Sequence, residues 1–267
     1  MAARPVLLVH GNPTWSFLWR KVIAALPGVR CVAPDLMGLG LSSKPERIAD
    51  HSLERHGGAV AELVGALDLR EVVLVGQDWG GPIVAQVGAL QPGRIGGLVL
   101  ANTAVLVPKH PRGSAFHRFA RVPGLSDVVF RGFGFPLGSL GRLQGDPQSL
   151  RGIPERAYRF PLRGWRERVA PLALARMVPD SLTHPSIPAL ARGEAWVRSF
   201  GGPVALVWGT RDPILGRSLE RHEVAFPRAA VTRTEAGHFL QEEVPEAIAA
   251  AVSAIARIAA GPVGAIP

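Results

Sequence analysis

The chain has 267 residues, and 47% of them are hydrophobic, which suits one domain with a large core or one domain with an inserted subdomain. Its formal net charge is +9, but the basic residues are mostly scattered arginines, with some excess between Arg112 and Arg176, and no nucleic-acid-binding motif accompanies them. The single cysteine, Cys31, excludes an internal disulfide and a zinc cluster, and no apolar run reaches the roughly 18 residues of a membrane-spanning helix. We therefore expect no nucleic-acid or membrane partner. The N-terminal apolar run is too short for a signal peptide, which predicts a cytoplasmic protein.

The first hundred residues alternate between strand patterns and helix patterns. Continuous apolar runs predict buried strands over residues 5–9, 31–33, 72–76 and 95–101. Apolar residues at helical spacing predict helices over residues 14–26, 53–67 and about 82–90, and a glycine-punctuated loop fills residues 34–45. The alternation predicts an α/β fold, with a mostly parallel sheet, right-handed crossovers and helices on both faces.

The strand pattern stops after Thr103. Between residues 104 and 187, proline, glycine, arginine and phenylalanine become frequent, and short helix patterns recur at residues 114–121, 155–160 and 165–177. We therefore expect a helical cap over residues 104–187, inserted into a core domain of residues 1–103 and 188–267. The core pattern resumes with a helix at 189–200, strands at 204–208 and 229–232, and a closing helix at 245–260.

The stretch from Val72 to Gly81 has the pattern of a nucleophile elbow, in which a strand turns sharply into a helix. Two small residues, Gly76 and Gly80, stand two positions before and two positions after Asp78. Small residues are needed there because a Cβ would keep the strand and the helix apart. The usual central residue is serine, so Asp78 predicts a carboxylate nucleophile instead.

Three residues follow predicted strands in the chain order nucleophile, acid and base: Asp78, Asp212 and His238. That order is typical of the α/β-hydrolase fold, and sites in parallel sheets form at the carboxyl ends of the strands. Taken singly, Asp212 also fits an Asp-Pro turn and His238 an ordinary loop histidine, but the three in order favour a catalytic triad. We expect His10 to support the loop after the first strand, and Asp35 to accept hydrogen bonds from backbone donors.

Several segments together resemble the haloalkane dehalogenases. The resemblance covers nearly the whole chain, and its most specific part is Asn12 combined with Asp78 and Trp79. The segments that carry it are His10-Gly11-Asn12-Pro13-Thr14-Trp15, Pro34-Asp35-Leu36-Met37-Gly38, Gly76-Gln77-Asp78-Trp79-Gly80-Gly81, Trp208-Gly209-Thr210-Arg211-Asp212-Pro213 and Gly237-His238-Phe239-Leu240. The resemblance implies the α/β-hydrolase fold, hydrolysis of haloalkanes to an alcohol and a halide, and a cis peptide bond between Asn12 and Pro13.

A carboxylate nucleophile suits displacement at a saturated carbon, so we expect Asp78 to form an alkyl ester and release a halide. The halide needs hydrogen-bond donors, and the side chains of Asn12 and Trp79 are the candidates. We expect His238, oriented by Asp212, to activate the water that hydrolyses the ester, with the backbone N–H groups of Asn12 and Trp79 as the oxyanion hole. The expected small partners are the halogenated substrate, water and the halide product. We expect no cofactor and no metal.

The position of the acid defines a subgroup of the resembling family. Some relatives carry the acid after the strand that precedes the cap, where this chain has Asn102, so we assign the acid to Asp212. Other relatives bind the halide with a cap tryptophan, for which Trp165 is the candidate, although Asn12 makes it unnecessary. Six cap phenylalanines fit either pocket walls or packing within the cap: Phe116, Phe119, Phe130, Phe133, Phe135 and Phe160.

The chain departs from its relatives near the N-terminus. The resemblance implies about two further strands before the strand at residues 5–9, and this sequence does not contain these N-terminal edge strands: either its start is misassigned or the sheet lacks this edge. An uncovered edge presents unpaired backbone groups to other chains. We therefore expect self-association or low solubility.

Two other functions stay open on the sequence. Epoxide hydrolases share the aspartate elbow, but they resemble a pattern with an aromatic residue in place of Asn12 and two cap tyrosines, whereas this chain has one tyrosine, Tyr158. A non-catalytic ligand receptor on the same scaffold is the other alternative, although a receptor has no evident need for an intact triad. Fluoroacetate dehalogenases are disfavoured because they carry arginine where Trp79 stands.

Overall fold

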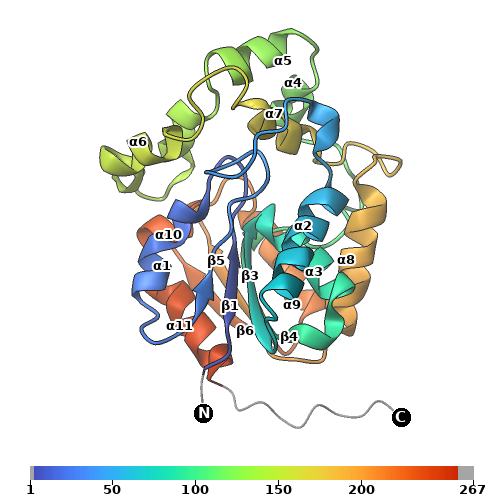
Figure 1. The fold of residues 1–267 in the computed structure, drawn as a ribbon, viewed down its shortest axis with the longest axis vertical. Helices are drawn as coiled ribbons and strands as arrows, with labels where there is room; N and C mark the ends of the chain where they lie inside the picture. The colour runs from blue at the N-terminus through green and yellow to red at the C-terminus, as the bar shows by residue number, and fades with distance from the viewer. Residues whose placement is uncertain (1–2, 258–267) are drawn as a thin grey trace.

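The computed structural model describes residues 3–257, and one parallel sheet forms its centre (Figure 1). Its strands are β1 (Val6–Val9), β2 (Cys31–Val32), β3 (Val72–Asp78), β4 (Ile95–Thr103), β5 (Val204–Gly209) and β6 (Ala230–Thr234). They lie in the order β2-β1-β3-β4-β5-β6, and every neighbouring pair is parallel. The predicted α/β-hydrolase fold is confirmed.

The two edge strands are less buried than the central ones. β2 is only two residues long and half-buried, because it pairs with β1 alone, so the prediction of a fully buried strand there is wrong. At the other edge, β6 is half-buried to exposed along its length. Among the described residues no strand pairs with the outer side of β2.

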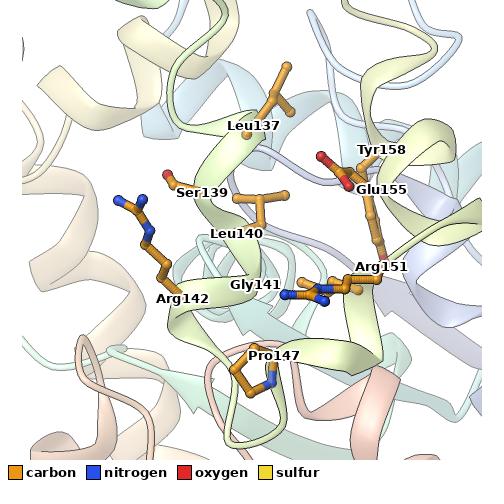
Figure 2. A pocket seen from close by; sticks show the side chains of 11 residues that line it. Leu137, Ser139, Leu140, Gly141, Arg142, Pro147, Arg151, Glu155 and Tyr158 are labelled. Atoms are coloured by element: carbon orange, nitrogen blue, oxygen red, sulfur yellow. The ribbon is translucent and has the colours of Figure 1, made fainter.

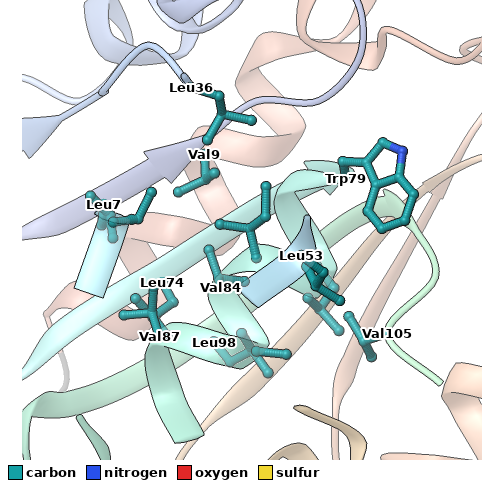
Figure 3. Packing of buried hydrophobic residues seen from close by; sticks show 14 of the residues in the cluster. Leu7, Val9, Leu36, Leu53, Leu74, Trp79, Val84, Val87, Leu98 and Val105 are labelled. Atoms are coloured by element: carbon teal, nitrogen blue, oxygen red, sulfur yellow. The ribbon is translucent and has the colours of Figure 1, made fainter. Parts of the chain in front are cut away.

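Helices cover both faces of the sheet because successive strand side chains point to opposite faces. The helices of one face are α2 (Leu53–Ala66), α3 (Gly80–Leu90), α8 (Ile187–Ser199) and α9 (Leu219–Ala225); those of the other are α1 (Arg20–Ala24) and α11 (Pro245–Ala256). Along β1, Leu7 and Val9 pack in the first layer, as Figure 3 shows, whereas Val6 and Leu8 pack in the second. The sheet is thereby held rigid beneath the ends of its strands.

Residues 104–186 form helices and turns without a strand, and we call this segment the cap. Its elements are α4 (Ala115–Ala120), α5 (Leu125–Asp127), η4 (Val128–Gly132), η5 (Leu137–Leu143), η6 (Pro147–Leu150), α6 (Ile153–Arg159) and α7 (Val169–Arg176). The cap lies over the carboxyl ends of the strands, at the top of Figure 1. Four of the phenylalanines pack against one another inside the cap: Phe116, Phe119, Phe130 and Phe135.

Several helix boundaries differ from the prediction. The helix expected over residues 14–26 is divided into a short 3-10 helix, η1 (Ser16–Trp19), and α1. The helix expected from Trp165 begins only at Val169, because Pro161 and Gly164 keep the preceding residues in turns. Residues 258–260 of the expected closing helix lie outside the described residues. In the described part of the chain, no helix is long and apolar enough to cross a membrane.

Candidate active site

Asp78 lies at the sharp turn between β3 and α3. Its φ of +51° is in the left-handed region, which non-glycine residues adopt at a cost. A Cβ on Gly76 would come within 2.6 Å of the Gly80 carbonyl oxygen, and a Cβ on Gly80 within 2.0 Å of the Val9 carbonyl oxygen. The Thr103 hydroxyl also donates to the Asp78 carbonyl oxygen at 2.5 Å. The elbow that the sequence predicts is therefore present, and its glycines are required by close backbone contacts.

The three residues of the predicted triad meet at this turn. His238 Nδ1 lies 2.9 Å from Asp212 Oδ2, and His238 Nε2 lies 3.8 Å from Asp78 Oδ2. The side chains of His238 and Asp212 are 2% and 0% exposed, whereas that of Asp78 keeps 18% exposure. The hydrogen bond to Asp212 leaves Nε2 of the imidazole directed toward Asp78. Asp78 is thus the most accessible member of a buried row of three groups.

The electrostatics of the row are set by burial and by the charges within it. Burial raises the pKa of Asp78 above its ordinary value, while the charge of His238 and backbone hydrogen bonds from Asn12 and Trp79 lower it part of the way back. Burial by itself would lower the pKa of His238. The charge of Asp212, its hydrogen bond and the charge of Asp78 outweigh burial, so the pKa of His238 is raised above its ordinary value.

Asn12 and Trp79, the predicted halide-binding residues, flank the Asp78 carboxylate. The peptide bond between Asn12 and Pro13 is cis, as the family resemblance implied. The Asn12 backbone N–H donates to Asp78 Oδ1 at 2.8 Å, and a Cβ on Gly11 would lie 2.2 Å from the same oxygen. Only a residue without a side chain therefore allows the chain to pass so close to the carboxylate.

The side-chain donors of these two residues both point at cap helix α7. Asn12 Nδ2 donates to the Pro171 carbonyl oxygen at 3.0 Å, and Trp79 Nε1 donates to the Leu174 carbonyl oxygen at 3.1 Å. Residues 171 and 174 lie about one helical turn apart, so the two donors converge on one side of α7. In this structure the cap itself satisfies both groups that we expect to hold a halide.

Two buried amides that the sequence did not identify hold the loops of the base and the acid. Asn102 Nδ2 donates to the carbonyl oxygens of Gly237 and His238 at 2.8 and 3.2 Å, and its Oδ1 accepts from the Gly209 N–H at 2.8 Å. Gln77 Nε2 donates to the His238 carbonyl oxygen at 3.2 Å and lies 3.4 Å from the ring Nε2. The sequence feature that could have pointed to Asn102 is its place as a polar residue at the end of a buried strand.

The cap clamps the histidine loop from the opposite side. The Leu143 carbonyl oxygen accepts from the His238 N–H at 2.8 Å. The Gln144 side chain accepts from the Phe239 N–H at 2.8 Å and donates to the Phe239 carbonyl oxygen at 3.2 Å. Sequence reasoning could not reveal these contacts because they join segments about 95 residues apart. The position of the base therefore depends on the cap as well as on the core.

A buried charged cluster joins the cap to the core beside the site. The Tyr158 hydroxyl donates to Glu242 Oε1 at 2.5 Å, and Arg20 binds both oxygens of the same carboxylate at 2.6 and 2.8 Å. The Trp15 indole N–H adds a bond to the Ala157 carbonyl oxygen at 3.1 Å. Tyr158, the only tyrosine of the chain, is therefore engaged by Glu242 and is not free to polarise an epoxide oxygen.

His10 and Asp35 take the supporting positions that the sequence predicts. His10 Nε2 accepts from the Leu36 N–H at 3.0 Å, and its Nδ1 lies 2.9 Å from the Gly11 carbonyl oxygen. Burial lowers the pKa of His10 to about 4, so the ring is neutral at neutral pH. The Asp35 oxygens accept from the backbone N–H groups of Ser16 and Leu41, each at 2.7 Å. Both residues shape the loops around the site.

Trp165, the alternative halide ligand, is on the outer surface of the cap. The residue is 45% exposed and its indole packs against the Arg131 guanidinium, so it is not buried beside the Asp78 carboxylate. A hollow of about 210 Å³ also belongs to the cap, between η5 and α6, with Leu140, Arg142 and Tyr158 among its lining residues (Figure 2). No group of three or more His, Cys, Asp or Glu side chains suited to a metal ion occurs within residues 3–257.

Comparison with known protein families identifies the chain as an alpha/beta hydrolase. The family model of the alpha/beta hydrolase fold matches residues 4–245, almost the whole described chain. The fold and the buried row of Asp78, His238 and Asp212 agree with that class.

The related proteins narrow the class further. The chain is 34% identical to a haloalkane dehalogenase of Mycolicibacterium paratuberculosis, and the match covers 90% of this chain and 79% of the relative. It is also 34% identical to haloalkane dehalogenase 2 of Mycobacterium tuberculosis, with 93% of this chain and 86% of the relative covered. The structure of the haloalkane dehalogenase DatA from Agrobacterium tumefaciens matches with a TM-score of 0.83 at 29% identity, over 95% of this chain and 89% of that one. The tetrameric structure of haloalkane dehalogenase DpaA from Paraglaciecola agarilytica matches with a TM-score of 0.80 at 25% identity, over 96% and 85%. The chain belongs to the haloalkane dehalogenases, hydrolases that act on carbon–halide bonds.

Proposed function

We propose that the chain hydrolyses haloalkanes in two steps, with Asp78 as nucleophile and His238 as base. The observation that carries the proposal is the different environment of the two carboxylate oxygens. Oδ1 is held by the Asn12 N–H at 2.8 Å, whereas Oδ2 faces His238 Nε2 across 3.8 Å. We assign the attack to Oδ2, which forms the bond to carbon while the carbon–halogen bond breaks and its electron pair leaves with the halide.

The departing halide would take the place of two carbonyl oxygens. Asn12 Nδ2 and Trp79 Nε1 now donate to the carbonyls of Pro171 and Leu174, and a halide between the donors would accept both bonds instead. Hydrogen bonds to a charged acceptor contribute roughly 1.5–3 kcal/mol each, more than bonds to a neutral carbonyl. Because both carbonyls belong to α7, one small displacement of this helix would free both donors.

The second step would hydrolyse the alkyl ester. His238 takes a proton from water, and the water oxygen attacks the carboxyl carbon of Asp78. The charge that develops on Oδ1 would be held by the backbone N–H groups of Asn12 and Trp79, and Asp212 would stabilise the imidazolium. Collapse of the intermediate breaks the ester bond, the imidazolium gives its proton to the departing alkoxide to form the alcohol, and the second proton of the water passes from the carboxyl group to solvent, which restores the carboxylate.

Formation of the ester would also prepare the base for this step. The charge of Asp78 is one of the influences that raise the pKa of His238. An ester carries no charge, so the pKa of His238 falls once the first step is complete. The imidazole would then lose a proton more readily, which favours the neutral form that a base needs when water has to be activated.

The two alternative functions fit the geometry less well. The epoxide hydrolase alternative lacks a free tyrosine, because Tyr158 is bound to Glu242. A non-catalytic receptor has no need for a nucleophile held in a left-handed conformation, which costs about 1–3 kcal/mol.

Self-association is part of the proposal. It is supported by the outer side of β2, with which no strand pairs among the described residues, and by the tetrameric structure of the relative from Paraglaciecola agarilytica. Light scattering would test it, and a monodisperse monomer would contradict it.

Bromide release from 1,2-dibromoethane and 1-bromobutane tests the proposed reaction. We expect the folded wild-type protein to release bromide, the Asp78→Asn variant to release none, and the exposed matched control Asp180→Asn to match wild type. Absence of release by folded wild-type protein across chain lengths and halogens would overturn the proposal.

A further inference from the structure

The positive charge of the chain is concentrated in the cap. Residues 104–186 contain 13 Lys and Arg against five Asp and Glu, a net charge of +8, whereas the whole chain carries +9. The rest of the chain is therefore nearly neutral. A field of one sign on one part of a surface favours association with a partner of the opposite sign.

Exposed apolar side chains occur on the same part of the molecule. Among residues 3–257, the exposed large aromatic side chains are Phe133, Phe160 and Trp165, all of them in the cap. On α6 and its end, Ile153, Arg156 and Phe160 are exposed at the i, i+3 and i+7 spacing of one helix face. Exposed apolar patches of this kind mark interaction surfaces.

The arginines and the aromatic side chains form one continuous surface. The Arg131 guanidinium lies 4.4 Å from the centre of the Trp165 ring, and that of Arg163 lies 4.3 Å from the Phe160 ring. Arg168 joins the two groups, because it donates to the carbonyl oxygens of Arg131 and Arg163 at 3.1 and 2.8 Å.

A hollow of about 600 Å³ adjoins these groups, with Phe133, Arg159, Arg163 and Arg168 in its wall. We call the surface the outer cap face and define it by six residues: Phe133, Arg156, Arg159, Phe160, Arg163 and Trp165. Most of it belongs to α6 and the residues that follow, and α6 lies on the left side of the cap in Figure 1.

We propose that the outer cap face binds the surface of an anionic phospholipid bilayer. Arginines bind lipid phosphates, and aromatic and aliphatic side chains enter the boundary between headgroups and acyl chains. This proposal departs from our expectation of no membrane partner, which rested on the absence of a membrane-spanning run, because contact with the bilayer surface needs no spanning helix. It also does not depend on the reaction proposed for Asp78.

Single-stranded nucleic acid is the competing partner for a surface of arginines and aromatic rings. Bases stack on free aromatic faces, but guanidinium groups already cover one face of Phe160 and of Trp165. Beside the face, the exposed aliphatic side chain of Ile153 on α6 offers no ring for stacking, whereas it suits an acyl boundary. The composition of the face therefore favours the bilayer.

Co-sedimentation with vesicles tests the proposal, using phosphatidylcholine alone and phosphatidylcholine mixed with phosphatidylglycerol. We expect binding to the anionic vesicles alone, weakened by salt. The combined Arg156→Gln, Arg159→Gln and Arg163→Gln variant should lose on the order of 10² in partition coefficient, because each arginine near an anionic leaflet contributes about fivefold. Phe133→Ser with Trp165→Ser should weaken binding at unchanged charge.

Matched control variants change exposed residues of the core domain, outside the cap. Arg30→Gln, Arg217→Gln and Arg228→Gln together remove the same charge from exposed positions, and Val224→Ser matches Phe133→Ser, since the two side chains are 83% and 82% exposed. These variants should bind like wild type. Circular dichroism checks that every variant is folded.

Three results would overturn the proposal. One is equal binding to neutral and anionic vesicles. Another is an equal loss of binding in the core controls. The third is tighter binding to a single-stranded oligonucleotide than to vesicles, weakened by the same cap variants.

Discussion

Replacement of Asn102 by alanine would remove the side chain that joins the loop of the acid to the loop of the base. The amide is fully buried and makes three hydrogen bonds, to the Gly209 N–H and to the carbonyl oxygens of Gly237 and His238. Alanine leaves those three backbone groups without their side-chain partner in a space closed to solvent. The variant therefore tests whether this position, where some relatives carry the acid, now holds the site together.

The cost follows from the bond lengths. Two of the bonds are 2.8 Å long and the third is 3.2 Å. Loss of a buried partner costs about 1–3 kcal/mol, so two good bonds at about 1.5 kcal/mol each and a weaker third give about 3–4 kcal/mol. That is a large share of a typical total stability of about 5–15 kcal/mol.

Urea unfolding, followed by circular dichroism, measures the loss as a lower midpoint at unchanged slope. Asn102→Asp is the matched control for shape. It keeps an acceptor for the Gly209 N–H but turns an oxygen toward two carbonyl oxygens, so it should also be destabilised. A loss below about 1 kcal/mol in Asn102→Ala, or an aspartate variant as stable as wild type, would refute the reasoning.

Four further predictions concern the halide donors, the pKa of the base, the pH dependence of ester hydrolysis and the cap. Asn12→Ala and Trp79→Phe should each lower kcat for bromide release on the order of 10²–10³-fold, as loss of a donor to developing charge does, and unchanged kcat would contradict their assignment. Asp78→Asn should lower the pKa of His238, measured by NMR titration of the imidazole, because one negative charge that raises this pKa is removed; an unchanged pKa would contradict the coupling. Below the pKa of His238 the imidazole is charged, so the single-turnover rate of ester hydrolysis should fall as the pH drops through that value. Tyr158→Phe removes a hydrogen bond to a buried carboxylate and should lower the free energy of unfolding in urea by about 1.5–3 kcal/mol; no change would show that the bond contributes nothing.

The fold could be predicted from the sequence because its information is local. Strands buried on both faces appear as continuous apolar runs, and β1, β3, β4 and β5 lie where such runs occur. β2 has the same kind of run but is half-buried, since burial depends on the number of neighbouring strands. The short helices α9 and α10 (Leu240–Glu243) were not predicted, because so few residues show no helical period.

The candidate site could also be predicted only in part. Asp78, Asp212 and His238 follow strands of one parallel sheet, so their meeting could be inferred from chain order alone. The bonds of Asn12 and Trp79 to α7 could not, because the cap has no regular pattern that fixes which of its carbonyls face the core. The same holds for the contact between Tyr158 and Glu242, which joins residues 84 positions apart.

The central claim is that Asp78 becomes an alkyl ester and that His238 is needed to hydrolyse it. Incubation of the His238→Phe variant with 1,2-dibromoethane or 1-bromobutane, followed by proteolysis and mass spectrometry, tests both parts at once. We predict a stable alkyl adduct on the peptide that contains Asp78, with about one bromide released per protein. An adduct on another residue, or continued turnover by the variant without any adduct, would contradict the claim.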